Sequence, residues 1–451
     1  MDRSLRAVLF GTFTLRFSTG LTGAMLVYYL AELPRHGGPA VSPVALGALT
    51  AAFFAAELLL SPPFGALSDR LGHHRVMQWG PLFGAVAVVL TWATTNLLLL
   101  GGTRLLEGAS TAASVPSILG YIALVTAGDV ALRGRAAARF EGATLAGLGI
   151  GLVAAGPLYE AVGRTAFLLN ALVYGLSYLV YRHGVAEPVV ATPLNAPTHY
   201  GLRRYLAVLL SSHVWLLAPT WIAINAALGI ATGQTVFQLV KAPDPRFADQ
   251  LLMGRASPSL VSLGLGIALV VFFAGLFYWG NRFRALRRTT IIFHGILGGG
   301  AIVVAAAILN HSQGLPPPLQ LTSVVVLVAG VFVLAGATPA ALGLLADISE
   351  AFPADRGAIM GLYSVFLALG QIGGNLLGGA AAEARGIDGL LLATFLLLVV
   401  ALVPLARLRA FEHVVGTEAP TRTGEAPTRG GSAAPGSPET GLPPGTSPTG
   451  R

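Results

Sequence analysis

Cysteine is absent from this 451-residue chain, and lysine and charged residues in general are scarce. Without cysteine there are no disulfides, no thiolate metal sites and no cysteine nucleophile. Charged residues make up only 11% of the chain, against roughly 25% in soluble domains. The formal net charge is +8, but Lys241 is the only lysine, and the arginines lie between apolar runs without interleaved aromatics. This pattern argues against a water-soluble fold and against a nucleic-acid-binding surface.

Apolar sequence dominates instead, since 54% of the residues are hydrophobic. About 20 mostly apolar residues in a helix cross a hydrocarbon core of roughly 30 Å, and runs of this length predict an all-α membrane protein with about twelve spans. The first run follows Arg3 and Arg6, is longer than a signal-peptide core and has no small-residue cleavage pattern, so we expect it to be retained. The expected spans are 5–31, 43–67, 74–95, 97–127, 139–161, 164–185, 205–240, 258–280, 288–310, 319–345, 357–383 and 387–410.

Arginine is distributed unevenly over the loops between these spans. If the N-terminus is cytoplasmic, the opposite loops hold only a small basic set: Arg35, Arg164, Lys241, Arg246, Arg255 and Arg385. The larger share then falls on the cytoplasmic side, as the excess of basic residues in short cytoplasmic loops requires. We therefore expect a multi-pass protein of the cytoplasmic (inner) membrane with both termini in the cytoplasm.

The spans fall into two groups of six around a polar, proline-bearing stretch. We expect an N-terminal six-helix bundle over 1–185, a cytoplasmic central linker over 186–204 and a C-terminal six-helix bundle over 205–410. Residues 411–451 are rich in Pro, Gly, Ser and Thr, repeat EAPTR and carry no aromatic after Phe411. This composition predicts a disordered cytoplasmic tail.

An internal repeat supports the division, because residues 133–163 align without gaps with residues 356–386. Glycines at matching positions would let spans five and eleven approach neighbouring backbones closely, as helices do in lipid. The alternative is chance similarity in a chain rich in glycine and alanine. Arg133, Gly134, Gly147, Gly151, Gly156, Glu160 and Gly163 match Arg356, Gly357, Gly370, Gly374, Gly379, Glu383 and Gly386.

The loop after the second span reads GALSDRLGHHR at residues 65–75. It resembles the loop signature G-x-L-x-D-R-x-G-x-x-R of the major facilitator superfamily, with Gly65, Leu67, Asp69, Arg70, Gly72 and Arg75 in place. At a helix end, an aspartate is able to pair with arginines and with the positive N-terminus of a neighbouring helix, while glycines permit a tight turn. Such an ion cluster would latch two halves together and break as they rock.

The alternative for this loop is a solvated, positive-inside turn, which explains the arginines but not the order of the residues. The corresponding loop of the second half reads GNRFRALRR and has no aspartate, so any latch there is weaker or different. The resemblance covers residues 1 to about 410 in span count and topology. It implies two six-helix bundles, a substrate site near the midplane between them and alternating access by rocking.

Charged residues are also expected inside the spans. Arg104 and Gly108 resemble the R-x-x-x-G motif that this superfamily carries near its proton-handling machinery. A charge at membrane depth costs about 2.5–3.5 kcal/mol on insertion scales, so Arg16 and Arg104 need partners or water. Glu107 shares a helix face with Arg104, and we expect the two to neutralise each other. Glu57 has no basic residue in its own span, so it pairs with Arg16 or Arg104 or is protonated, which makes it the candidate proton carrier.

The fifth span contains AAGPLYEAVG at residues 154–163. Gly156 and Pro157 resemble the core of the span-five motif that is associated with antiporters in this superfamily. Leu152, Glu160 and Ala161 stand where that motif has glycine. Proline within a span also simply bends a helix, so this motif leaves the direction of transport open.

Other polar residues in the spans are candidates for a substrate cavity, and each is equally a candidate for a hydrogen bond between helices. They are Thr14, Ser18, Asn225, Gln234, Gln371 and Asn375. His213 and His294 are isolated in apolar spans, where we expect packed histidines. The sequence contains no metal-binding or hydrolytic motif, so we expect no cofactor, no metal site and no enzyme activity.

Together these features predict a secondary active transporter of a small molecule. We expect proton-coupled efflux of a hydrophobic or drug-like solute by a monomer in the lipid bilayer. The first alternative is a proton-coupled importer of a nutrient or organic anion, because Arg16 is a buried cation. The second alternative is a lipid-handling membrane protein without ion coupling.

Overall fold

The computed structural model describes residues 3–187, 214–282, 285–350 and 356–416, and this part of the chain is helical without any β-strand. Three segments on which the sequence makes predictions lie outside the described residues. They are the expected linker beyond residue 187, the start of the seventh expected span with His213, and the expected tail beyond residue 416.

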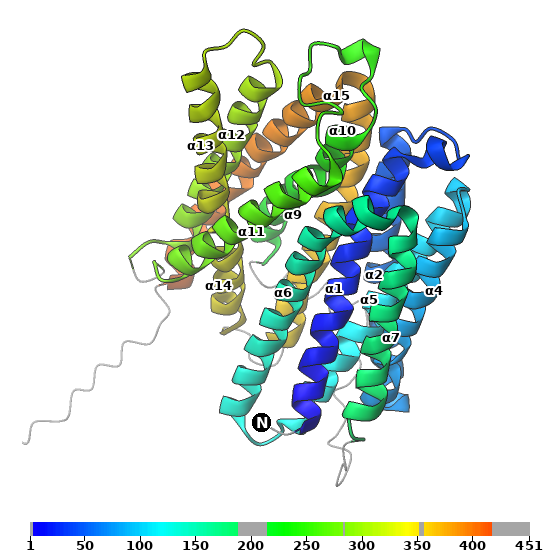
Figure 1. Cartoon of the computed structure of the whole chain (residues 1–451). Coiled ribbons are helices and arrows are strands. Elements are labelled where there is room, and N and C mark those ends of the chain that lie inside the picture. The colour runs from blue at the N-terminus through cyan, green and yellow to red at the C-terminus, as the bar shows by residue number, and fades with distance from the viewer. Residues whose placement is uncertain (1–2, 188–213, 283–284, 351–355, 417–451) are drawn as a thin grey trace, which may run out of the picture.

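The N-terminal half consists of helices α1 to α7, coloured blue to green-cyan in Figure 1. The helices are α1 (Arg3–Ala31), α2 (Pro43–Leu71), α3 (His73–Val76), α4 (Trp79–Ala93), α5 (Leu97–Val125), α6 (Val130–Val162) and α7 (Ala166–Gly184). Short 3₁₀ turns, η1 (Leu33–His36) and η2 (Gly163–Thr165), follow α1 and α6.

The C-terminal half consists of α9 to α15. Its elements are α9 (Val214–Gly229), the π-helical turn η3 (Ile230–Thr235), α10 (Val236–Val240), η4 (Pro245–Phe247), α11 (Pro258–Gly280), α12 (Arg288–Asn310), α13 (Pro317–Leu334), α14 (Ala337–Glu350) and α15 (Arg356–Gly416). The 61 residues of α15 are two helices joined by a kink, because Arg385 and Gly386 leave helical geometry and Gly386 has a φ of 60°.

Side-chain caps explain where several helices begin. Ser42 accepts from the N–H of the third residue of α2, and Asn96 caps α5 in the same way. Asp129 caps α6, so α6 begins nine residues before the predicted start at Arg139. Each cap satisfies an N–H group that has no partner within its own helix.

Nine helical segments of the described residues are long and apolar enough to cross a membrane. Two of them, Leu132–Gly184 and Gly361–Ala410, are 53 and 50 residues long, and each contains a break at Gly163 or at Arg385–Gly386. A span needs about 20 residues, so each of these segments has the length of two spans. Helix α1 has 29 residues and carries Arg16 in its middle, and it is not one of the nine.

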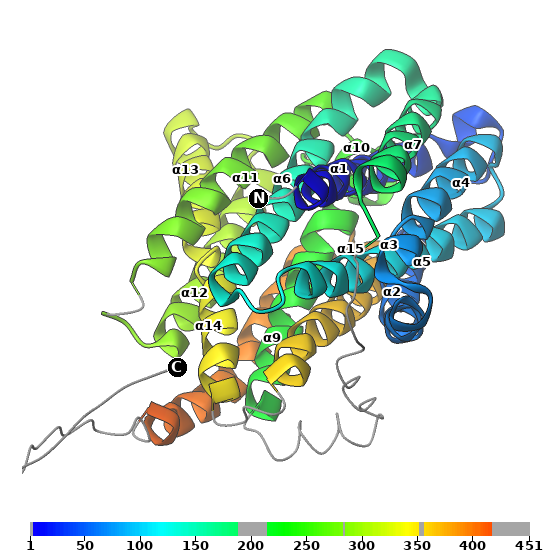
Figure 2. The same cartoon turned by 90° about the horizontal axis from the view of Figure 1, so that it is seen from below.

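One end of the molecule carries the N-terminus, and we call the opposite end the distal end. The distal end holds the connections α1–α2, α4–α5, α6–α7, α10–α11 and α12–α13 and the kink of α15 (Figure 1). Seen from the N-terminal end in Figure 2, α11 to α14 lie on one side and α2, α4, α5 and α7 on the other. The two halves contact each other where α2 meets α15, where α6 meets α11 and where α1 meets α10.

The repeated glycines lie where helices of the same half approach most closely. A Cβ at Gly147 or Gly151 of α6 would overlap the backbone of α1 at Phe13 and Phe17. Gly370 and Gly374 of α15 lie in the same way against α9 at Ile222 and Ala226. The close approach predicted from the repeat therefore occurs in both halves, between α1 and α6 and between α9 and α15.

Candidate functional site

Arg104 and Glu107 form a buried ion pair on α5. Their exposed fractions are 6% and 3%, and the Arg104 guanidinium donates to Glu107 Oε2. The guanidinium also lies over the ring of Phe53 on α2, 4.7 Å from its centroid. The neighbouring Gly108 lies against the Phe53 carbonyl oxygen, so α5 and α2 pack closely beside the pair. The two side chains neutralise each other, as their spacing on one helix face predicts.

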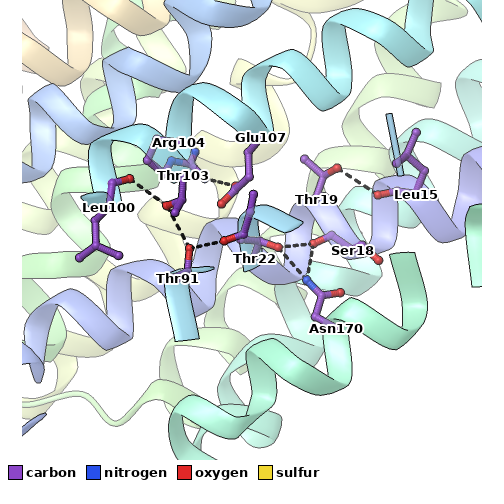
Figure 3. A network of polar contacts seen from close by, with 11 residues as sticks. Leu15, Ser18, Thr19, Thr22, Thr91, Leu100, Thr103, Arg104, Glu107 and Asn170 are labelled. Atoms are coloured by element: carbon purple, nitrogen blue, oxygen red, sulfur yellow. Dashed lines mark hydrogen bonds and ion pairs between the residues drawn. The ribbon is translucent and has the colours of Figure 1, made fainter. Parts of the chain in front are cut away.

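A network of buried polar side chains lies beside this pair (Figure 3). The Asn170 amide on α7 donates to the Ser18 carbonyl oxygen at 3.0 Å and to Thr22 Oγ1 at 2.7 Å, both on α1. Thr91 on α4 donates to Thr103 Oγ1 on α5 at 3.0 Å. These contacts tie α1 to α7 and α4 to α5 inside the N-terminal half. In an apolar surrounding such bonds fix the relative positions of the helices.

Arg16 and Glu57 are both half-buried and lie on different helices, α1 and α2. The charge of Arg16 acts on Glu57, but the two are farther apart than an ion pair, and no other cation contacts the Glu57 carboxylate within the described residues. Arg16 is close to α6, because a Cβ at Gly147 would overlap the Arg16 Cβ. Glu57 is thus a carboxylate of the bundle that has a positive neighbour without direct neutralisation.

The residues of the loop signature lie at the N-terminal end of the molecule. Gly72 ends α2 with a φ of 96°, a conformation that favours glycine. Asp69 is exposed, and its ion-pair contact is with His73 at 3.7 Å rather than with an arginine. Arg75 is 3.4 Å from Glu187, and both side chains are exposed. The remaining residues, Gly65, Leu67 and Arg70, lie in the last two turns of α2, which ends at Leu71.

Gly156 of the span-five motif lies between the two halves of the molecule. Its N–H donates to Ser262 Oγ of α11 at 2.8 Å, and a Cβ there would overlap the Pro258 carbonyl oxygen. Pro157 is exposed, whereas Glu160 binds Ser259 at the start of α11. Gly156 of the span-five motif therefore forms a contact between the two halves.

The six candidate cavity residues make hydrogen bonds within and between helices. Thr14 and Asn225 bond to carbonyl oxygens of their own helices, and Asn375 donates to the Gln371 carbonyl oxygen at 2.8 Å. Gln234 of η3 donates to the Pro43 carbonyl oxygen of α2 at 2.9 Å. Three side-chain atoms of these six residues are buried without a partner: Ser18 Oγ, Gln234 Oε1 and Asn375 Oδ1.

Comparison with known proteins identifies the family of this chain. The family model described as Major Facilitator Superfamily matches residues 8–314. The chain belongs to the major facilitator superfamily. The family that the sequence resembles is thereby confirmed.

Curated relatives and solved structures are similar to the chain over different lengths. The quinolone resistance protein NorA of Staphylococcus aureus is 22% identical over 384 residues, which is 84% of this chain and 90% of NorA. The human chromaffin granule amine transporter is 29% identical over 191 residues, 41% of this chain and 34% of that protein. The nucleoside transporter NupG has a TM-score of 0.69 at 16% identity and covers 91% of this chain and 99% of its own.

A bacterial homologue of the human lysosomal transporter Spinster, solved in an inward-facing and unoccupied conformation, has a TM-score of 0.63 at 14% identity. It covers 91% of this chain and 96% of its own. These structural likenesses show the fold. Membership of the superfamily makes this chain a multi-pass membrane transporter of small molecules rather than an enzyme.

Sequence reasoning missed several polar residues of this member of the superfamily. Asn170, Thr22, Thr91 and Thr103 look like isolated polar residues in apolar runs, and only the helix packing brings them together. Gln238 is fully buried, and neither polar atom of its amide has a partner. Its signal in the sequence is a second glutamine four residues after Gln234, on the same face of the helix.

The distal end also holds a cluster that no sequence motif indicates. Atoms of Asp249, His311 and Asp388 lie within 4.8 Å of one another, and His311 Nε2 is 3.0 Å from Asp388 Oδ2. The buried Asn310 donates to Asp388 at 2.8 Å and accepts from the N–H of Leu252. The cluster joins the α10–α11 connection, the end of α12 and the kink of α15.

Proposed function

We propose that this transporter exports a hydrophobic or drug-like solute in exchange for protons by alternating access. The observation that carries the proposal is the half-buried Glu57, which the charge of Arg16 reaches without a direct ion pair. A carboxylate held in this way changes its interactions when it binds a proton, because only the charged form attracts the arginine. The similarity to NorA, a quinolone resistance protein, supports a drug-like solute.

The architecture we propose has twelve spans, both termini in the cytoplasm and the protein in the cytoplasmic (inner) membrane. Division of the two long apolar segments at Gly163 and at the α15 kink, together with α1, supports this number. The six-helix bundles are then residues 1–185 and 205–410, joined by the linker 186–204 and followed by the tail 411–451. The distribution of arginine supports the orientation.

Within this scheme Glu57 carries the proton and Arg104 with Glu107 positions α5 against α2. The Arg104–Glu107 pair is already neutral and lies under Phe53, which supports a structural role. Deprotonated Glu57 is attracted to Arg16 and draws α2 toward α1. Protonation removes this attraction and lets the two helices adjust. Such a change couples proton binding to the positions of α1 and α2, which contact α10 and α15 of the other half.

In the conformation that is closed at the N-terminal end, the loop signature then holds the two halves together at that end. Contacts between halves near the distal end, such as Gly156 with Ser262 and Gln234 with Pro43, support a distal side that is closed here. Exposed Asp69, paired with His73 and not with an arginine, supports a signature that is disengaged in this state. The distal side is the outer side in this scheme.

Import of an organic anion is the second candidate, because Arg16 is half-buried without a direct carboxylate partner. In that case Arg16 binds the anion and Glu57 is the coupling group or a spectator. The fold likeness to a nucleoside transporter is compatible with either direction. A lipid-handling protein without ion coupling is the remaining alternative.

Transport in proteoliposomes separates these candidates. Lipophilic cations, dyes and organic anions are tested for gradient-driven transport and for exchange, with native protein, Glu57→Gln, Arg16→Ala and the control Glu32→Gln at the distal surface. We expect lipophilic solutes to move against a proton flux, and Glu57→Gln to abolish gradient-driven transport while exchange continues. If only anions move and Arg16→Ala alone abolishes their binding, the protein is an importer. If the flux through native protein does not depend on the pH gradient, the result supports the lipid-handling protein without ion coupling.

A further inference from the structure

The two halves meet near the distal end at two helix crossings that the internal repeat relates to each other. In the first, Gly156 of α6 lies against the carbonyl oxygen of Pro258, the first residue of α11. In the second, Gly379 of α15 lies against the carbonyl oxygen of Pro43, the first residue of α2. Gly156 and Gly379 are aligned in the repeat, so the same close approach occurs twice.

Hydrogen bonding distinguishes the first crossing. Ser262 Oγ of α11 accepts from the Gly156 N–H at 2.8 Å and donates to the Leu152 carbonyl oxygen at 3.2 Å. One hydroxyl thus bonds both members of an i, i+4 backbone pair in α6, next to Pro157, which has no N–H. Tyr28 Oη of α1 is 3.3 Å from the same oxygen, and because the Ser262 hydrogen is used on Leu152, Tyr28 is the donor in this contact. Ser262 is 1% exposed, so these bonds are sheltered from water.

Glu160, one turn after Gly156 on α6, binds the N-terminal end of α11. Glu160 Oε1 accepts from the Ser259 N–H at 3.0 Å, and Glu160 Oε2 accepts from the Ser259 hydroxyl. Ser257, the N-cap residue of α11 itself, accepts from the Leu260 N–H at 3.3 Å. The first N–H groups of a helix have no partners of their own and attract negative charge. Glu160 therefore stabilises the end of a helix that belongs to the other half.

The second crossing has no such arrangement in the described residues. Glu383 is aligned with Glu160, yet its Oε2 is buried and has no hydrogen-bond partner. The α2 N-terminus is capped by its own Ser42, which accepts from Ala45 N at 3.1 Å. Gln234 supplies the contact to Pro43, and the rest of the crossing is close glycine packing.

We infer that the α6–α11 crossing is a polar latch that holds the distal side closed, with Ser262 and Glu160 as its positioning residues. The α2–α15 crossing is the packed pivot about which the halves turn. When the distal side opens, Ser262 leaves α6, and the Gly156 N–H is free to bond the Leu152 carbonyl oxygen directly. Helix α6 therefore remains helical in both states. The inference rests on the proposed alternating access but not on the solute or the coupling ion.

Spin labels across the latch test this inference. Because the chain has no cysteine, Arg164→Cys and Arg255→Cys give one exposed label on each half at the distal end without background. Double electron–electron resonance then reports the ratio of open to closed distal states without solute or gradient. We expect Ser262→Ala to raise this ratio about fivefold, as loss of one net hydrogen bond does, and Glu160→Gln to raise it less because that side chain is exposed.

Two matched controls belong to the experiment. Ser323→Ala removes a buried serine hydroxyl that bonds only the Leu319 carbonyl oxygen of its own helix, and Glu383→Gln changes the aligned carboxylate at the other crossing. If both latch variants give the same ratio as these controls, the inference is wrong. Glu160 is exposed, so its variant tests the latch even where Ser262→Ala does not fold. The spin-label measurement needs neither solute nor a proton gradient. If transport assays on the same variants show no proton-coupled efflux, the ratio of open to closed distal states still tests the latch.

Discussion

The buried pair of Arg104 and Glu107 gives the sharpest prediction of stability. Glu107→Gln removes the negative charge and leaves Arg104, at 6% exposure, without a counter-ion. Breaking a buried ion pair in this way costs about 3–5 kcal/mol, because the remaining charge is desolvated and unpaired. Replacing both residues, as in Arg104→Met with Glu107→Leu, removes both charges at similar volume, and we expect the double variant to recover most of that loss.

The measurement is the free energy of unfolding in detergent micelles by titration with SDS, for native protein, Glu107→Gln and the double variant. The pair of Glu32 and Arg35 is the matched control, because it has the same i, i+3 spacing but exposed fractions of 34% and 77%. We expect Glu32→Gln to change the free energy by less than about 1 kcal/mol. If Glu107→Gln is no more destabilising than Glu32→Gln, the pair is not desolvated in the folded state and the structural role assigned to it is wrong.

Two further predictions concern other parts of the molecule. Asn170→Ala removes the amide that donates to the Thr22 hydroxyl and to the Ser18 carbonyl oxygen, and we expect it to lower the free energy of unfolding by about 1–3 kcal/mol in the same titration. In the α10–α11 connection, the Arg246 guanidinium and its backbone N–H donate to Asp244 and lower the pKa of that carboxyl from 3.8 to about 2. A lowered pKa stabilises the folded state above pH 4 and loses this effect as the pH falls toward 2. The thermal midpoints of native protein and Asp244→Asn should therefore differ by a constant amount from pH 8 to pH 5 and converge below pH 4.

Each of these two predictions, for Asn170→Ala and for Asp244→Asn, has a result that would contradict it. An Asn170→Ala variant as stable as native protein would mean that water replaces the amide between α1 and α7. A difference between native protein and Asp244→Asn that changes between pH 5 and pH 8 would mean that another group titrates with the Asp244 contact.

The positions of the helices follow from the sequence to a large extent because a bilayer demands apolar runs of fixed length. The predicted spans 258–280 and 288–310 coincide with α11 and α12. The prediction for 319–345 missed the break between α13 and α14 near Ala335 and Gly336, because both residues continue the apolar run. Apolar composition specifies that a segment is in the membrane but does not specify where its helix is interrupted.

Predictions of the site succeeded where partners lie on one helix and failed where they lie on different helices. Arg104 and Glu107 are three residues apart, so their pairing follows from helix geometry alone. Asp69 was expected near arginines and lies beside His73, which is four residues away on the next helix. The partner of Gly156 is Ser262, more than a hundred residues away, and no local pattern indicates it. Contacts between halves depend on the conformation of the transporter as well as on its sequence.

The π-helical turn η3, Ile230–Thr235, changes which direction the later side chains of the seventh span face. A π-turn holds one residue more than an α-helical turn, so every later side chain is rotated by about 100° relative to an uninterrupted helix. Gln234 lies within this π-turn, and its amide donates from there to the carbonyl oxygens of Pro43 and Asn375. A helical wheel drawn through residues 214–240 therefore assigns Gln238 to the wrong side. The surplus residue therefore changes which neighbours the side chains at the end of the span face, although the apolar sequence continues through it.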